Sequence, residues 1–118
     1  MKMKSVDDVS KEDVTAFGST GTTIQWIWGK KDEVPNFFLR RFAITPGNHI
    51  GLHDHLEEHE IFVLSGEGIV FDGSGREIAI RPGDSLFVPP DEPHGYKNTG
   101  TSNLTFLCII PRLSKDNA

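Results

Sequence analysis

Turns that contain glycine, proline or aspartate recur from residue 22 onward and leave only short segments between them. The segments are rich in β-branched and aromatic residues, and several alternate apolar and polar residues with period two, which is typical of half-buried strands. Strands are expected at 22–28, 37–44, 60–64, 69–71, 76–80, 85–88, 94–98 and 104–110, with a further strand carrying residues 53–55. No segment predicts a helix. Short strands at this regular spacing favour an all-β sandwich or barrel over any α/β fold.

The length of 118 residues fits one domain with a single modest core and room for one ligand cavity. Residues 1–20 are polar and are expected to form an N-terminal arm. The barrel is then expected to span residues 21–113, followed by a C-terminal tail at 114–118.

The balance of charges argues against nucleic acid and membrane partners. Twelve Lys and Arg residues face 17 Asp and Glu residues, a net charge of −5, which repels phosphate backbones and anionic lipid. The single cysteine, Cys108, excludes an intrachain disulfide. The N-terminal segment has lysines but no apolar stretch of a secretory signal, so the expected location is the cytoplasm.

Histidines form the most informative cluster of the chain. The five are His49, His53, His55, His59 and His94. On a strand, His53 and His55 would project from one face and could converge on a single ion. Neutral imidazole is the commonest metal ligand. His59 or Glu60 could supply a third donor and His94 a fourth; the alternative is a set of scattered surface or capping histidines.

Four other strand positions, Arg40, Phe42, Phe106 and Cys108, are candidates to line a cavity. Arg40 shares its face with apolar neighbours that include Phe42, so its side chain is expected either at the barrel rim or, as the less favoured alternative, facing a ligand carboxylate or Glu60. Phe106 and Cys108 share a face of the last strand. Cys108 is expected to be a small buried hydrophobe, with a cavity-lining thiol near a metal as the alternative.

The sequence Gly47-x5-His53-x-His55-x4-Glu60-x5-Gly66 resembles the first motif of the cupin superfamily, G-x5-H-x-H-x3–4-E-x6-G. The sequence Gly83-x5-Pro89-x3-Pro93-His94-x3-Asn98 resembles the second, G-x5-P-x-G-x2-H-x3-N. Two departures stand out: the closing glycine of the first motif comes one residue early, and Asp91 replaces the middle glycine of the second.

The resemblance implies a double-stranded β-helix, the conical jelly-roll barrel of cupins, with a metal in its mouth. The segment from Pro35-Asn36-Phe37 through Phe106-Leu107-Cys108-Ile109-Ile110-Pro111 resembles small cupins whose metal is held by four histidines, which would here be His53, His55, His59 and His94. Glu60 would then be a neighbouring carboxylate, because adjacent strand residues point to opposite faces. An all-nitrogen site favours one divalent transition metal, with Mn or Fe expected ahead of Ni, Cu and Zn.

The resemblance leaves three functions open. The first is a metal-dependent oxidoreductase, dioxygenase-like, that acts on a small organic molecule. The second is an isomerase or lyase that uses the metal as a Lewis acid, and the third is a non-catalytic module that binds a metabolite or metal. Candidate catalytic residues are Glu60, Arg40 and Tyr96. A homodimer is expected to cover Trp26, Trp28, Phe37 and Phe38, with the arm crossing to the partner.

Overall fold

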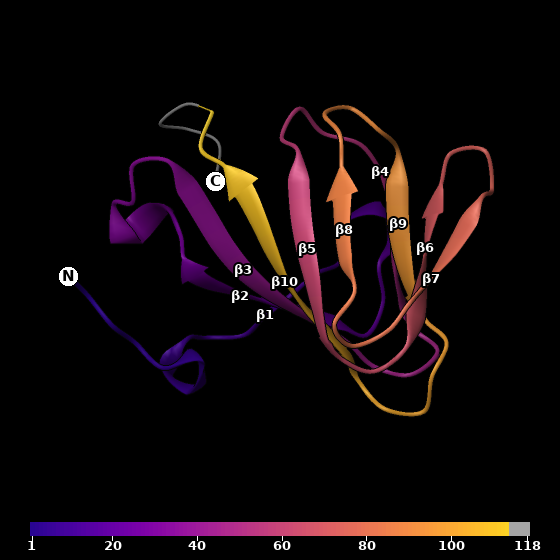
Figure 1. Ribbon diagram of the computed structural model, residues 1–118. Coiled ribbons are helices and arrows are strands. Elements are labelled where there is room, and N and C mark those ends of the chain that lie inside the picture. The colour runs from indigo at the N-terminus through magenta and orange to yellow at the C-terminus, as the bar shows by residue number, and fades with distance from the viewer. Residues whose placement is uncertain (114–118) are drawn as a thin grey trace.

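The structure is a computed structural model that describes residues 1–113, and strands dominate it (Figure 1). The strands are β1 (Glu12–Asp13), β2 (Thr22–Trp28), β3 (Phe37–Ile44), β4 (His49–His53), β5 (His59–Ser65), β6 (Gly68–Asp72), β7 (Glu77–Ile80), β8 (Ser85–Val88), β9 (His94–Asn98) and β10 (Leu104–Pro111). The only helical elements among the described residues are three short 3₁₀ turns: η1 (Val6–Asp8), η2 (Ala16–Gly18) and η3 (Lys30–Asp32).

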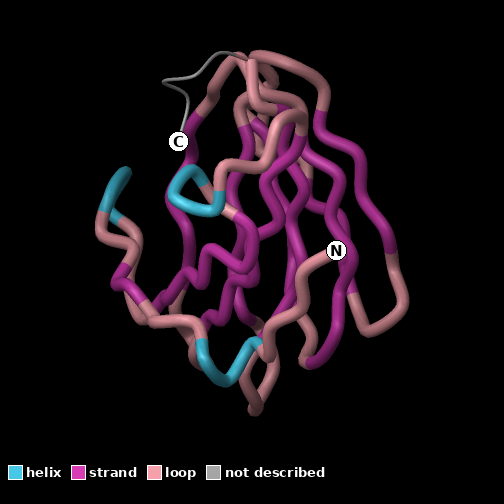
Figure 2. The backbone as a smooth tube through the Cα atoms, turned by 90° about the vertical axis from the view of Figure 1, so that its left-hand side faces the viewer, coloured by secondary structure: helices cyan, strands magenta, loops and turns pink. Residues whose placement is uncertain are grey.

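The strands form two antiparallel sheets that face each other. One sheet has the order β1-β2-β3-β10-β5-β8, and the other has the order β4-β9-β6-β7. From β3 onward the chain passes repeatedly between the sheets, so strands far apart in sequence become neighbours; β10 lies between β3 and β5. Figure 2 shows the strands from the side, with helical turns confined to the periphery. This arrangement confirms the predicted all-β double-stranded β-helix.

Apolar side chains fill the space between the sheets. Strand β3 shows how the sequence achieves this, since its residues alternate regularly between a buried and a less buried side. The buried side carries Phe38, Phe42 and Ile44, and the same row holds Arg40. The opposing sheet contributes Ile50, Val70 and Tyr96 to the same core. The period-two pattern thus places one face of each strand inside the barrel.

The expected strand 53–55 does not exist in the form predicted. Strand β4 ends at His53, and His55 lies in the loop that leads to β5. The register of β4 against β9 also shifts between Ile50 and His53, which marks an irregularity at this end of the strand. The loop is fixed to the β8–β9 loop instead, because the Asp91 amide nitrogen donates to the His55 carbonyl oxygen at 2.8 Å.

Asp91 and Asn98 explain two positions of the second motif. Asp91 has a φ of +64°, in the left-handed region that glycine adopts most readily, and aspartate is among the few other residues that tolerate it. Asn98 is buried, and its Nδ2 donates to the carbonyl oxygens of Ile44 and Ser102 at 2.7 and 2.8 Å. Asn98 therefore links β9 of one sheet to the end of β3 in the other.

The N-terminal segment is attached to the barrel rather than projecting from it. Strand β1 pairs with β2 through Glu12 and Asp13. Gln25 Nε2 donates to the carbonyl oxygens of Val6 and Val9 at 2.9 and 3.0 Å and so holds η1 on the six-stranded sheet. Within residues 1–113, no helix is long and apolar enough to cross a membrane.

Candidate metal centre

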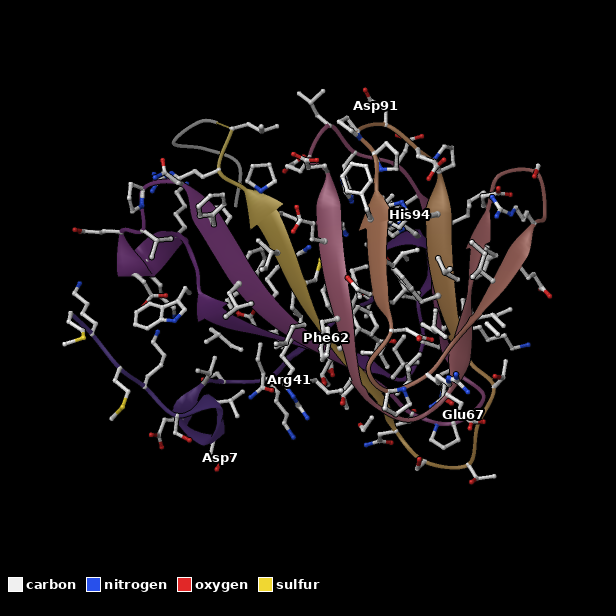
Figure 3. All side chains as sticks on the ribbon, viewed as in Figure 1. Asp7, Arg41, Phe62, Glu67, Asp91 and His94 are labelled. Atoms are coloured by element: carbon white, nitrogen blue, oxygen red, sulfur yellow. The ribbon has the colours of Figure 1, made fainter. Side chains whose placement is uncertain are left out.

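Three histidines converge between the two sheets. His53, at the end of β4, is the direct cross-strand partner of His94, at the start of β9, and their ring centroids are 4.4 Å apart. The His55 ring lies 5.5 Å from that of His53 and 5.2 Å from that of His94. One ring nitrogen from each of the three lies within 4.8 Å of the others, a spacing that could hold one metal ion. Figure 3 places His94 at the same end of the barrel as Asp91, with Glu67 at the opposite end.

Backbone carbonyls determine which nitrogen each histidine presents. His53 Nδ1 lies 2.7 Å from the carbonyl oxygen of Gly51, and His55 Nδ1 lies 2.7 Å from that of Glu57. His94 Nδ1 lies 2.8 Å from the carbonyl oxygen of Glu92. Because a carbonyl oxygen only accepts, each Nδ1 carries the proton, and each neutral ring keeps its lone pair on Nε2.

His94 Nε2 is buried and has no hydrogen-bond partner. A buried nitrogen without a partner costs free energy unless something binds it. Nδ1 donation to a carbonyl is also the outer contact that metal-ligating histidines make. These residues therefore fit a divalent transition metal.

His59 lies against this cluster on β5. Its ring stacks on that of His55, with centroids 4.2 Å apart and an interplanar angle of 16°, and lies 5.1 Å from the ring of His94. It does not join the group of three convergent nitrogens. His59 Nδ1 lies 3.2 Å from Cys108 Sγ. The next residue, Glu60, is exposed on the outer side of the sheet, as the alternation along a strand requires, and takes no part in the cavity.

Arg40 is buried, with 8% of its surface exposed, so the expectation of a rim position is wrong. Its Nη2 donates to Cys108 Sγ at 2.9 Å. Its guanidinium carbon lies 5.0 Å from the Phe42 ring centroid and 5.4 Å from that of Trp26. In residues 1–113 no carboxylate forms an ion pair with it. The sequence pattern could not distinguish a rim position from a buried position for Arg40, because both lie on the same face of a strand.

A cavity of about 200 Å³ adjoins the histidines. Its polar lining comes from Arg40, Tyr96, Cys108, His53, His55 and His59, and its apolar lining comes from Val14, Phe17, Ile24, Phe42, Ile50 and Phe106. All four residues proposed from the sequence to line a cavity, namely Arg40, Phe42, Phe106 and Cys108, lie here. A larger open hollow of about 690 Å³ lies under the N-terminal arm, but it holds none of the histidines.

Sequence analysis missed the lining residues Ile24 and Ile50 and also Phe17 and Val14, which belong to the polar N-terminal segment. Phe17 stacks on His53 with ring centroids 4.6 Å apart and an interplanar angle of 10°. It has a φ of +61°, which is unusual for a bulky residue. A Cβ on Gly51 would collide with the Phe17 carbonyl, so Gly51 lets η2 lie close against β4. The only sequence signal was the Phe17-Gly18 dipeptide, an apolar residue beside a turn former.

Burial favours the uncharged form of His53, His59 and His94. Desolvation lowers the pKa of His94 to about 4 and that of His59 to about 2, and the nearby positive charge of Arg40 adds to both shifts. Desolvation also lowers the pKa of His53. Metal ligation requires neutral imidazole, so these rings have the required protonation state at neutral pH without competition from protons.

These pKa shifts predict that acid destabilises the metal-free protein. Unfolded histidine titrates near 6.5, whereas folded His94 titrates at about 4, so between these values the unfolded chain binds protons that the folded chain does not. Stability is therefore full above pH 6.5 and falls as the pH decreases, with a slope of about 1.4 kcal/mol per pH unit for each such histidine. Thermal unfolding of chelator-treated protein from about pH 7.5 to about pH 4.5 measures this. His94→Gln should flatten the curve; an unchanged slope in that variant would contradict the assignment.

Comparison with known proteins agrees with this geometry. The cupin domain family matches residues 40–110, a segment that begins within β3 and ends within β10. An oxalate-binding protein of Thermotoga maritima is 42% identical over 71 residues, which cover 59% of this chain and 58% of that protein. The match therefore spans less than two thirds of that relative's length.

Two solved structures are similar over most of this chain. The polyketide cyclase RemF from Streptomyces resistomycificus has a TM-score of 0.87 at 32% identity, covering 94% of this chain and 79% of that one. A predicted oxalate decarboxylase from Thermotoga maritima has a TM-score of 0.82 at 27% identity, covering 93% of this chain and 98% of that one. The two-sheet barrel, the histidine cluster and the family match over residues 40–110 lead to one conclusion: this chain belongs to the cupin domain family.

Proposed function

We propose that this protein is a metal-dependent oxidoreductase, dioxygenase-like, that uses one divalent transition metal held by His53, His55, His59 and His94 to act on a small organic molecule. The observation that carries the metal site is the set of Nδ1 contacts to backbone carbonyls, which leaves Nε2 of His53, His55 and His94 free to bind an ion. When bound, such a metal supplies a redox centre and a Lewis acid.

His59 is the proposed fourth ligand because it shares the features of the other three. It is buried, its ring contacts that of His55, and its Nδ1 is engaged by Cys108 Sγ at 3.2 Å. Ligation through Nε2 requires the tautomer in which Nδ1–H donates to Sγ, just as Nδ1 donates to a carbonyl oxygen in the other three histidines. The resulting all-imidazole set favours Mn or Fe, with Ni, Cu and Zn as the other candidates, over the oxygen-preferring Mg and Ca.

The chain's own residues supply positioning and exclusion of water rather than a base. No carboxylate is among the described residues that line the cavity. Glu60, the carboxylate considered from the sequence, faces the opposite side of β5. Phe42 and Phe106, stacked with centroids 5.3 Å apart, form an apolar wall. An isomerase or lyase needs a side-chain base within reach. Tyr96 lines the cavity, but burial raises the pKa of its hydroxyl well above the ordinary value, so it is a donor rather than a base. This lining therefore favours chemistry that the metal performs.

A second candidate is Lewis-acid catalysis without redox change. It is favoured by the similarity to a structure named a polyketide cyclase, which extends over 94% of this chain. Because one fold hosts many activities, the distinction must come from measurement.

Two measurements test the proposal. Elemental analysis and electron paramagnetic resonance of the purified protein should find one transition metal per chain. Oxygen consumption is then measured for the Mn- and Fe-loaded protein with a panel of small organic acids and phenols. Turnover that persists without oxygen consumption would favour the Lewis-acid candidate. Thermal stabilisation by a compound that is never converted would instead indicate a binding module.

The ligand set predicts a ranking of two adjacent variants. His59→Ala should lower metal affinity by at least tenfold, because an inward imidazole is lost, and loss of an outer contact alone costs roughly 10–100-fold in affinity. Glu60→Gln should change metal binding by about twofold or less, because Glu60 faces away from the cavity. Glu60 is neither a ligand nor one of the outer contacts to a ligand whose loss costs roughly 10–100-fold. Metal content after dialysis against a fixed free-metal buffer measures both. The reverse ranking would restore a site of three histidines and one glutamate.

Self-association is proposed through a different surface from the one expected. Phe38 is fully buried and Trp26 and Trp28 are half-buried, so of the four expected contact residues only Phe37 is widely exposed. The outer side of the six-stranded sheet instead exposes four large apolar residues on adjacent strands, and these are Phe62, Leu64, Phe87 and Ile109. Arg41 and Glu60 also lie on this surface and carry opposite charges. In a twofold-symmetric dimer, Arg41 of one chain could pair with Glu60 of the other.

We therefore propose a homodimer through this outer surface, on which Figure 3 labels Phe62 and Arg41. Size-exclusion chromatography with light scattering at micromolar concentration should give twice the chain mass. Phe62→Lys should shift the mass to that of one chain, since it would bury an unpaired charge in an apolar interface. A wild-type monomer at this concentration would refute the dimer.

A further inference from the structure

Three buried polar atoms lack a hydrogen-bond partner; two belong to residues that line the cavity, and the third belongs to the histidine cluster that adjoins it. They are Nε of Arg40, the hydroxyl oxygen of Tyr96 and Nε2 of His94, and the described residues contain no other buried side-chain nitrogen or oxygen in this state. A bound metal accounts for His94 Nε2. It does not account for the other two, because a guanidinium never ligates a metal and both Arg40 and Tyr96 carry hydrogens to donate.

Arg40 brings a positive charge into this space with little to balance it. Its described contacts are the Cys108 sulfur at 2.9 Å and the faces of two aromatic rings. The four histidines supply no negative charge, and no carboxylate lines the cavity in residues 1–113. A bound divalent cation would increase the same positive charge. Isolated buried charge is costly, and its retention is most readily understood if an anion completes the site.

We infer that the cavity binds a small organic carboxylate, whose oxygens accept from Arg40 Nε and the Tyr96 hydroxyl while its carbon skeleton packs on Phe42 and Phe106. The inference rests on the proposed metal centre for the second positive charge and for the reacting group. Arg40 and Tyr96 are on this basis substrate-binding residues that determine specificity for anions.

The walls restrict the size and shape of the ligand. The cavity of about 200 Å³ is smaller than the pockets of roughly 300–1,000 Å³ that hold drug-sized ligands. Apart from the histidines, Arg40, Tyr96 and Cys108, its lining is apolar and in part aromatic. A compact acid with one apolar end fits both the charge and the walls, whereas a phosphorylated sugar or a peptide does not.

Matched pairs of anion and neutral amide test this inference. Binding of pyruvate and benzoate, each with its amide (pyruvamide and benzamide), is measured by calorimetry on metal-loaded and on chelator-treated protein. Each acid should bind at least tenfold more tightly than its amide, because a charge-assisted hydrogen bond to guanidinium is lost with the amide. Equal affinity of acid and amide, or no binding of either acid, would overturn the inference.

Two arginine variants on adjacent positions of β3 separate binding from structure. Arg40→Met should weaken acid binding at least tenfold, leave amide binding unchanged and retain the metal. Its unliganded melting temperature should stay the same or rise, because an unpaired buried charge is removed. Arg41→Met, on the outer side of the strand, should leave acid binding unchanged. Tyr96→Phe should weaken acid binding by a smaller factor, since one neutral donor is lost.

The outcomes distinguish this inference from the proposed function. If Arg40→Met keeps full metal occupancy and binds the acids like wild type, the carboxylate site is wrong and the metal centre stands. If the wild-type protein takes up no metal but the chelator-treated protein still binds acids in an Arg40-dependent way, the metal proposal fails and the anion site stands. If Arg40→Met is instead strongly destabilised with its metal retained, Arg40 is structural and the inference is overturned.

Discussion

Replacing His94 by alanine is expected to abolish metal binding while leaving a folded barrel. His94 joins His53 across the β4–β9 pair, and its Nε2 is buried without a partner, so it contributes a donor that no neighbour can replace. Loss of a direct ligand should exceed the roughly 10–100-fold that loss of an outer contact costs. Elemental analysis after dialysis at a fixed free-metal concentration should show occupancy reduced at least tenfold.

His49 provides the matched control for the His94→Ala variant. It lies on the same strand as His53, but its Nδ1 lies 3.3 Å from Thr20 Oγ1 and it does not belong to the convergent group. His49→Ala should therefore keep full occupancy. Added metal should raise the melting temperature of wild type and of His49→Ala but not that of His94→Ala, because only a protein that binds the ligand is stabilised by it. Full metal occupancy in His94→Ala would remove the basis of the proposed site.

The largest loss of stability is expected for Phe38→Ala. Phe38 has no exposed surface, packs edge-on against Trp26 at 6.0 Å between ring centroids, and belongs to the core between the two sheets. Truncating a buried phenylalanine costs about 3–5 kcal/mol, from lost burial and from the cavity left behind. Because net stability is only about 5–15 kcal/mol, this is a large fraction of it. Chemical denaturation should show the lower midpoint with an unchanged slope.

The adjacent residue is the control for this prediction. Phe37 lies on the opposite side of β3 and is 65% exposed, so Phe37→Ala should change stability by about 0.5 kcal/mol or less. The pair has the same chemistry and the same strand, and differs only in the direction of the side chain. Equal losses of stability in both variants would mean that the alternation of buried and exposed side chains along β3 does not determine which of them stabilise the core.

Prediction from the sequence worked best where side-chain periodicity and turn chemistry act locally. Strands β2, β3, β8 and β9 have the bounds expected from apolar alternation and flanking turns. It was less accurate where the backbone departs from regular geometry. His55 lies beyond the end of β4, and its ring reaches the cluster because the loop is held by the Asp91 amide rather than by strand pairing.

The N-terminal segment shows a second kind of failure. Its polar composition gave no reason to connect it with the cavity, yet Phe17 stacks on His53 and Val14 lines the wall. These contacts depend on the pairing of β1 with β2 and on the close approach that Gly51 permits. They join residues more than thirty positions apart, and no local pattern records such a contact.

What the sequence determined by itself is the all-β barrel and the grouping of His53, His55 and His94, because strand periodicity, turn residues and the spacing of a metal motif are local properties of the chain. Only the tertiary structure decided that Arg40 lies inside, that Glu60 lies outside and that His53 faces His94 across a strand pair. The physical reason is that depth along a barrel and the neighbours across a sheet follow from strand register and closure. Those are fixed by the packing of all the strands together.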